Sequence, residues 1–197
     1  MSLDITGITN GLVTITSELI GSRLSTVNAG GGTTKPSVIV NRSGGNKPNF
    51  PYAVVDHVGI NSEGYSSSSN YMDDNEDEVT EIDYTGRFLI QVNGGISDDV
   101  LSICTELRGR LFTGKGNNLF LNNITAGRLL SVSSVTFFPT RLKTDFEEVA
   151  RITIDLSLRD IIVDDTTSTI ESIDLDGEIY NDFEQVDPPL SVNITAP

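Results

Sequence analysis

The chain contains a strictly alternating run, Ile152-Thr153-Ile154-Asp155-Leu156-Ser157-Leu158-Arg159, in which apolar side chains occupy every second position. Successive side chains of a β-strand point to opposite faces of its sheet, so this run predicts a strand with one apolar and one charged face. The apolar face needs a covering layer, whereas the charged face can remain in water. We therefore expect a sheet that is covered by other elements on one side only.

The rest of the sequence supplies further strand patterns and two helical patterns. Strands are predicted over residues 52–60, 82–92, 129–138 and 150–163, with short or doubtful ones at 38–40 and 169–174. Helices are predicted over 9–28, and from an N-cap at Ser97 to about residue 112, because apolar residues recur there at spacings of three and four. A doubly wound parallel fold would need strands that are apolar on both faces, and that pattern is absent. The predicted fold class is α+β: an antiparallel or mixed β-sheet of about four main strands, with two helices packed on one face.

Length and composition indicate a single domain. A chain of 197 residues is long enough to bury one good core. We predict one domain over residues 1–180, interrupted by a mobile serine-rich and acidic loop at 61–78, because that segment cannot bury enough apolar area to offset its ordering entropy. Residues 181–197 are acidic and proline-containing, which predicts an extended C-terminal tail.

The charge and the cysteine count exclude several classes of function. A net charge of -15 opposes binding to a phosphate backbone, which depends on Lys and Arg contacts. Cys104 is the only cysteine, so no disulfide can form within the chain. The N-terminus lacks the features of a signal peptide, and no segment is apolar enough to span a bilayer. We therefore expect synthesis in a reducing cytoplasm and no membrane partner.

Two motifs resemble ligand-binding loops but lack decisive residues. Residues 109–116 approach a phosphate-binding loop, yet Gly116 stands where a magnesium-binding hydroxyl is required. The segment also follows a predicted helix, so a glycine C-cap with a solvated Lys115 is the preferred interpretation. The acidic run at 73–78 resembles the start of a calcium loop but has Glu78 in place of the obligatory glycine.

Single reactive side chains give no better support for catalysis. His57 is the only histidine and is expected on the surface, whereas Cys104 lies on the apolar stripe of the second predicted helix and is expected in the core. No pair of carboxylates stands out by its spacing among the 28 acidic residues. We therefore predict no catalytic residue, no cofactor and no metal site.

Four segments of the chain belong to one recognisable pattern: Phe50-Pro51-Tyr52-Ala53-Val54-Val55-Asp56, Glu106-Leu107-Arg108-Gly109-Arg110-Leu111-Phe112, Thr144-Asp145-Phe146-Glu147-Glu148-Val149-Ala150-Arg151 and Arg159-Asp160-Ile161-Ile162. Together they resemble the bacteriophage neck or tail terminator family. The matches occur in order over roughly residues 10 to 180, and the third block is the most specific. The loop at 61–78 and the acidic tail have no counterpart in that likeness.

The resemblance implies a structural, non-enzymatic virion protein assembled in the host cytoplasm. Members of the family form a ring, generally a hexamer, that caps the head-proximal end of the tail tube and stops its polymerisation. The implied partners are further copies of the chain, the tail tube protein, the sheath protein if the tail contracts, and a neck or head-completion protein. DNA would pass through the channel without specific binding. Two alternatives remain open: another tail or head–tail joining protein, such as a tube or head-completion protein, or an acidic hydrolase.

The candidate assembly contact lies in and just before the alternating strand. Phe146 is an apolar side chain among charged neighbours, which fits either a contact with another subunit or a plug at the edge of the core. Two arginines on the polar face could pair with a neighbouring subunit's carboxylates or could simply be solvated. The predicted interface residues are Thr144, Asp145, Phe146, Glu147, Glu148, Arg151 and Arg159.

Overall fold

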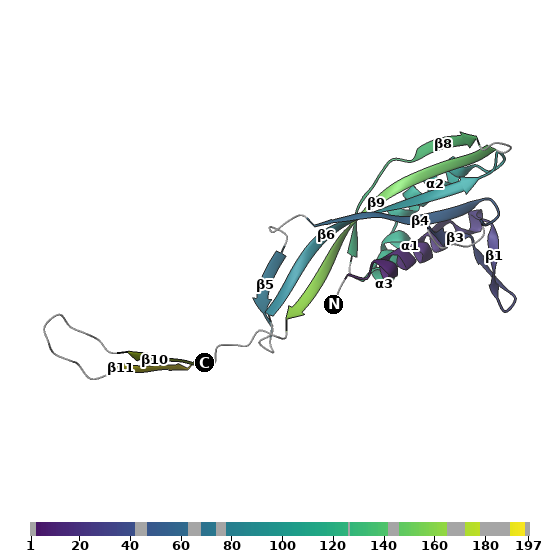
Figure 1. Cartoon of the computed structure of the whole chain (residues 1–197). Helices are drawn as coiled ribbons and strands as arrows, with labels where there is room; N and C mark the ends of the chain where they lie inside the picture. The colour runs from purple at the N-terminus through teal and green to yellow at the C-terminus, as the bar shows by residue number, and fades with distance from the viewer. Residues whose placement is uncertain are drawn as a thin grey trace.

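The computed structural model describes residues 3–41, 47–62, 68–73, 78–125, 127–141, 146–164, 172–177 and 190–195. The helices are α1 (Ile5–Ile20), α2 (Val100–Leu111) and α3 (Gly114–Asn123), with the short 3-10 helix η1 (Gly21–Arg23) after α1. The strands are β1 (Thr26–Gly30), β2 (Thr33–Pro36), β3 (Val38–Val40), β4 (Tyr52–Ser62), β5 (Ser68–Met72), β6 (Glu78–Gly94), β7 (Gly127–Val132), β8 (Thr136–Arg141), β9 (Phe146–Asp164), β10 (Ser172–Gly177) and β11 (Leu190–Thr195). The predicted α+β class is confirmed (Figure 1).

The main sheet is larger than predicted and is mixed. It has seven strands in the order β3-β4-β6-β9-β7, with β5 added to β6 and β8 added to β9. Only β3 and β4 run parallel, and the remaining pairs in this sheet are antiparallel. The sequence predicted about four main strands because the additional ones are short or polar. The long pair β6 and β9 forms the centre, and their register extends from Glu78 opposite Asp164 to Gly94 opposite Glu148.

All three helices cover one face of this sheet, which we call the inner face. Helix α1 packs on β3 and β4, α2 packs on β6 and β9, and α3 packs on the other two helices and β7. The predicted alternation of β9 is confirmed, because its four apolar residues at positions 152, 154, 156 and 158 are fully buried. Burying each such side chain contributes roughly 1.5–3 kcal/mol, so this face provides much of the stability of the fold.

The far end of the sheet extends beyond the helical layer. We call this extension the arm: it consists of β5, residues 78–83 of β6 and residues 159–163 of β9. Figure 1 shows it projecting away from the helices, with β5 at its outer edge. The prediction of a loop over 61–78 is therefore wrong for residues 68–72. Serine-rich β5 joins the sheet through backbone hydrogen bonds, which its side-chain pattern does not reveal, and residues 63–67 and 74–77 lie outside the described part of the chain.

The first predicted helix, 9–28, begins and ends too late. Helix α1 starts at Ile5, where the Asp4 carboxylate accepts a hydrogen bond from the Gly7 backbone N–H at 2.8 Å. It ends before Gly21, and the chain then forms the hairpin β1–β2. The turn of this hairpin contains Gly31 and Gly32, both with positive φ, which glycine adopts without strain. Residues 26–28, which were predicted as helix, belong to β1 of this hairpin.

A third helix, α3, lies in a part of the chain for which the sequence predicted no helix or strand. Helix α3 follows α2 almost directly, and the Thr113 hydroxyl caps it by accepting from the Gly116 backbone N–H at 3.2 Å. The predicted glycine C-cap of α2 is wrong, since Phe112 is the C-cap and Gly114 opens the next helix. A Cβ at Gly116 would stand 2.4 Å from the Arg110 carbonyl oxygen, so this close approach of two helix ends requires glycine.

The remaining differences concern single boundaries. The N-cap of α2 is Asp99 rather than Ser97, and the predicted strand 129–138 is divided into β7 and β8. The doubtful strand at 169–174 corresponds to β10, which pairs with β11 in a separate two-stranded sheet. Strand β11 falls in the predicted tail, and the division into one domain and a tail remains a prediction.

Candidate assembly surface

The face of the sheet opposite the helices, which we call the outer face, carries the polar side chains of β6 and β9. The register places Arg87 opposite Asp155, Leu89 opposite Thr153 and Gln91 opposite Arg151 on this face. These positions alternate with the buried core residues of the same strands, so their direction is fixed by the strand period. The outer face is therefore a chemically mixed surface that the fold itself leaves without a helical layer.

Two ion-pair groups cross the strands of the outer face. Arg87 Nε donates to Asp155 Oδ1 at 2.8 Å, and the Ser131 hydroxyl donates to Asp155 Oδ2 at 2.9 Å. The hydrogen bond from Arg87, supported by that from Ser131, holds the pKa of the Asp155 carboxyl below its usual value. Arg159 bridges Asp83 at 3.0 Å and Glu81 at 2.9 Å. These contacts link β6, β7 and β9 and stabilise the register of the sheet.

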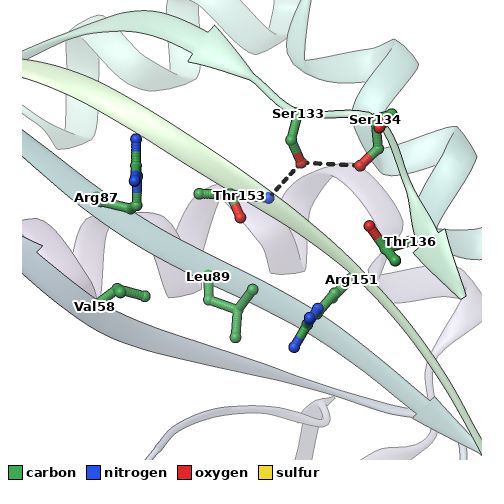
Figure 2. A pocket seen from close by; sticks show the side chains of 8 residues that line it. All are labelled: Val58, Arg87, Leu89, Ser133, Ser134, Thr136, Arg151 and Thr153. Carbon is green, nitrogen blue, oxygen red and sulfur yellow. Dashed lines mark hydrogen bonds between the residues drawn. The ribbon is translucent and has the colours of Figure 1, made fainter. Parts of the chain in front are cut away.

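A shallow hollow of about 340 Å³ lies on the outer face where β7 gives way to β8. Figure 2 shows Arg87 and Arg151 on opposite sides of it with Leu89 between them, and Ser133, Ser134 and Thr136 along one side. The guanidinium of Arg151 stacks on the Phe138 ring at 4.4 Å from its centroid. The lining residues are Val58, Arg87, Leu89, Ser133, Ser134, Thr136, Arg151 and Thr153. Guanidinium and hydroxyl donors in an open hollow suit a carboxylate or another acceptor from a partner protein.

The other end of the outer face is partly covered by the segment that precedes β4. Lys47 pairs with Glu147 at 2.9 Å, and the Tyr52 hydroxyl donates to the same carboxylate at 3.4 Å. Phe50 stacks on Tyr52 with 5.7 Å between the ring centroids. Burial, followed by the charge of Glu147, raises the pKa of the Tyr52 phenol. Glu147 is therefore engaged within the chain.

The structure separates the predicted interface residues into different environments. Glu147 is buried under Lys47, and Arg159 forms the ion pairs described above, whereas Arg151 faces the open hollow. Glu148 lies on β9 opposite Pro139, and Phe146 begins the same strand. Thr144 and Asp145 lie outside the described residues. The role of all these residues in assembly remains a prediction.

Sequence reasoning did not predict the hollow. Its floor comes from two strands that are far apart in the sequence, and its rim comes from Ser133 and Ser134 between β7 and β8. The signal present in the sequence was the serine-rich interruption of an otherwise apolar run at 131–134. That interruption marks the point where the edge strand beside β9 is divided into β7 and β8.

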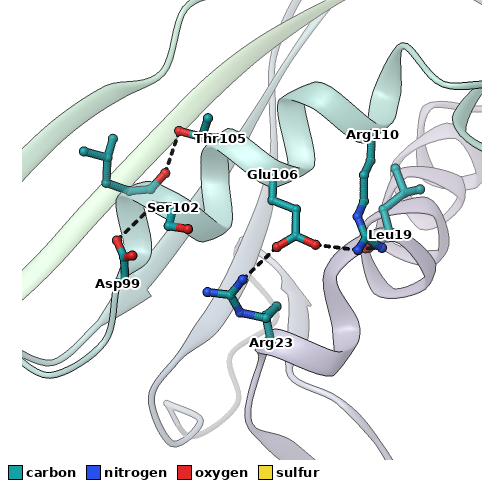
Figure 3. Close-up of polar contacts among 8 residues, drawn as sticks. Leu19, Arg23, Asp99, Ser102, Thr105, Glu106 and Arg110 are labelled. Atoms are coloured by element: carbon teal, nitrogen blue, oxygen red, sulfur yellow. Dashed lines mark hydrogen bonds and ion pairs between the residues drawn. The ribbon is translucent and has the colours of Figure 1, made fainter.

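Ion pairs and hydrogen bonds join α2 and α3 to the C-terminal end of α1. Glu106 pairs with Arg23 at 2.8 Å and also with Arg110, whose guanidinium donates to the Leu19 carbonyl oxygen at 2.7 Å (Figure 3). Lys115 donates to the Glu18 carbonyl oxygen at 3.2 Å. These contacts occupy the C-terminal carbonyl groups of α1, where cations are favoured by the helix dipole. The cations of the apparent phosphate-binding motif therefore join helices to each other.

The single histidine is half-buried against the inner face of the sheet, and the single cysteine is fully buried. His57 contacts the Phe88 ring with 5.3 Å between centroids, and its Nε2 is buried with no hydrogen-bond partner in the structure. The prediction of a surface histidine is wrong, because the register of β4 directs residue 57 to the inner face. Cys104 is buried as predicted, and burial raises the pKa of its thiol to about 12.

The described residues hold neither a cluster of metal ligands nor a helix that could cross a membrane. Within that part of the chain, no three His, Cys, Asp or Glu side chains gather closely enough to hold a metal ion. Of the helices that the structure describes, none has the length and apolar character needed to cross a membrane.

Comparison with known proteins agrees with the resemblance seen in the sequence. The family model described as phage neck terminator protein matches residues 10–182, which span α1 to β10. Among curated proteins, none matches the sequence. The matched range includes the inner-face core, the outer face and the arm. The chain therefore belongs to the phage neck terminator protein family, whose members are structural proteins of the virion.

Proposed function

We propose that the chain caps the tail tube of a bacteriophage as a closed ring, generally a hexamer, that stops tail polymerisation and joins the tail to the head through the neck. The observation that carries this proposal is the family match over residues 10–182. The partners would be neighbouring copies, the tail tube protein, a sheath protein in a contractile tail, and a neck or head-completion protein. Assembly would occur in the host cytoplasm before the virion is released.

The distribution of surfaces on the monomer supports assembly into a ring. In a closed ring each copy uses one patch to bind a different patch on the next copy. The open outer face and the projecting arm are two such patches, and they lie on different parts of the same sheet. The start of β9, at residues 146–148, lies at the opposite end of this strand from the arm, which is a suitable place for a second class of contact. Neither the outer face nor the arm resembles a catalytic pocket.

The test is to observe the protein alone and together with tail tubes. We expect negative-stain microscopy to show rings of uniform size with a central hole, either in solution or at the ends of tubes. Adding the protein to polymerising tube subunits should limit the length of the tubes. Light scattering would give the number of copies in each ring.

Different results would support the alternatives or refute the proposal. Stacking of the purified protein into long filaments would indicate a tube protein. A protein that stays monomeric and leaves tube length unchanged would refute tail capping. A broad esterase and phosphatase screen tests the hydrolase alternative, and a turnover that survives purification to homogeneity would favour it.

A further inference from the structure

The arm presents apolar side chains on both of its faces. Tyr71, Ile161 and Val163 belong to the outer face, and Met72 and Ile162 belong to the inner face. All five are between 43% and 55% exposed. Val79 on the outer face of the arm is buried, whereas these five side chains stay half exposed, and apolar side chains left exposed together favour a partner.

The arm is also acidic. Its described side chains, together with the adjoining Asp73, include five carboxylates, Asp73, Glu78, Glu81, Asp83 and Asp160, but only one cation, Arg159. Arg159 already bridges Glu81 and Asp83. The arm therefore has an excess of negative charge beside its exposed apolar residues, and a partner surface should combine apolar groups with a cation.

The hollow on the outer face has that combination. Val58 and Leu89 provide apolar surface, and Arg151 forms no ion pair among the described residues. Its guanidinium is held in place by the Phe138 ring, with hydroxyl donors nearby. The hollow is thus complementary to the arm in both charge and polarity.

The arm and the hollow of one copy cannot meet each other. Arg151 and Ile161 lie on the same strand, ten positions apart, which corresponds to about 33 Å of extended chain. The sheet that separates them is held rigid by its hydrogen bonds and its core. Their complementarity can therefore be satisfied only between two copies, and a repeated contact of this type between unlike patches is the kind that closes a ring.

We propose that the arm of one copy docks across the outer face of the next copy, with arm carboxylates at the hollow around Arg151. This inference rests on the proposed ring, because it names the surfaces that hold neighbouring subunits together. The occupant of the hollow is a second copy of this chain. Tail tube and neck proteins then bind other surfaces of the ring.

Cross-linking between introduced cysteines tests the contact directly. The double variant Ile161→Cys with Thr136→Cys places one thiol on the arm and one at the rim of the hollow. The native Cys104 is fully buried, so it gives no background with a short bismaleimide. We expect a ladder of dimers, trimers and larger species up to the size of the ring, whereas each single variant gives at most a dimer.

A matched control replaces the arm position by Leu121→Cys, which is exposed on α3 in the helical layer. Together with Thr136→Cys it should give no ladder. Rings seen by microscopy without a ladder from the arm–hollow pair would overturn the docking and leave the proposed function intact. An equal ladder from the control pair would also overturn the docking. Absence of both rings and ladders, with or without tail tubes, would overturn both proposals.

A charge reversal provides a second measurement without cysteine chemistry. Arg151→Glu should weaken self-association by about tenfold or more, because it places a carboxylate among carboxylates at the contact. Lys35→Glu in β2 makes the same change of net charge away from the contact and should leave self-association unchanged. Wild-type self-association of Arg151→Glu would contradict the proposed contact.

Discussion

At the scale of single residues, the protonation of the Asp155 carboxyl group on the outer face depends on its neighbour Arg87. The hydrogen bond from Arg87 lowers the pKa of Asp155 in the folded protein. A group with a lowered folded pKa stabilises the fold above its unfolded pKa of about 3.9 and loses that contribution as the pH falls through the folded value. The effect of this pair on stability therefore belongs to the acid range below about pH 4.

We predict that Arg87→Gln raises the pKa of Asp155 toward its ordinary value. The change should cost little unfolding free energy at neutral pH, because the Arg87 side chain is 57% exposed and solvent screens the pair. NMR titration of the Asp155 carboxyl carbon measures the shift. Lys35→Gln removes a charge elsewhere and should leave that titration unchanged, and an unshifted Asp155 in Arg87→Gln would contradict the prediction.

A second residue-scale prediction concerns the thiol of Cys104. Burial raises the pKa of this thiol to about 12, so almost no thiolate exists at pH 8 and reagent cannot reach the sulfur. We expect no labelling by a disulfide reagent in native protein and labelling of one thiol per chain in denaturant. Rapid labelling of the native protein would show that α2 opens readily from the sheet.

Single residues also show where sequence reasoning succeeds. Cys104 was predicted in the core because its neighbours on the helix repeat at helical spacing, which is a local signal. The bonds of Arg159 were not predicted, because Asp83 and Glu81 lie 76 and 78 residues away in the sequence. His57 was misplaced because β4 has a register irregularity between residues 57 and 59, which shifts the apparent alternation.

At the scale of elements, β9 provides the sharpest contrast between two faces of one strand. We predict that Ile154→Ala lowers the free energy of unfolding by about 2–5 kcal/mol, because the side chain is fully buried between the sheet and the helices. Ser157→Ala on the outer face should change it by less than about 0.5 kcal/mol. Urea unfolding measures both, and similar losses would contradict the assignment of the two faces.

Helix α3 depends on its N-cap more than on its sequence propensity. We predict that Thr113→Ala costs about 1 kcal/mol of unfolding free energy, because the Gly116 backbone N–H loses its acceptor. Asn118→Ala, at an exposed position of the same helix, should cause no loss. Urea unfolding distinguishes the two variants, and an unchanged midpoint for Thr113→Ala would show that packing alone holds the helix.

The elements that the sequence failed to predict share a physical cause. Helix α3 begins Gly114-Lys115-Gly116-Asn117-Asn118, which has low helix propensity, and it forms against α1 and α2. Strand β5 is polar and joins β6 through backbone groups. Both depend on tertiary contacts, whereas α2 and β9 carry their periodicity within their own sequences. The hollow could not be predicted for the same reason, since its walls come from β4, β6, β8 and β9 and from the segment that joins β7 to β8.

At the scale of the whole molecule, one sheet serves two purposes. Its inner face holds the core with all three helices, and its outer face and arm remain available to other proteins. A fold of this kind separates stability from assembly, because substitutions on the outer face can alter contacts without opening the core. The same separation explains why variants such as Arg151→Glu are useful tests of assembly.

The net charge of the molecule leads to a final prediction about DNA. The proposed ring would have to let DNA pass without retaining it, and a chain with 28 acidic and 13 basic residues repels phosphate on average. We therefore predict that the purified protein retains no duplex DNA on a filter, even at low salt, where any Lys and Arg contacts would be strongest. A basic protein of similar size serves as the positive control. DNA retention that falls as the salt concentration rises would reveal a phosphate-binding surface. The surface that contacts DNA would then be basic although the chain as a whole is acidic.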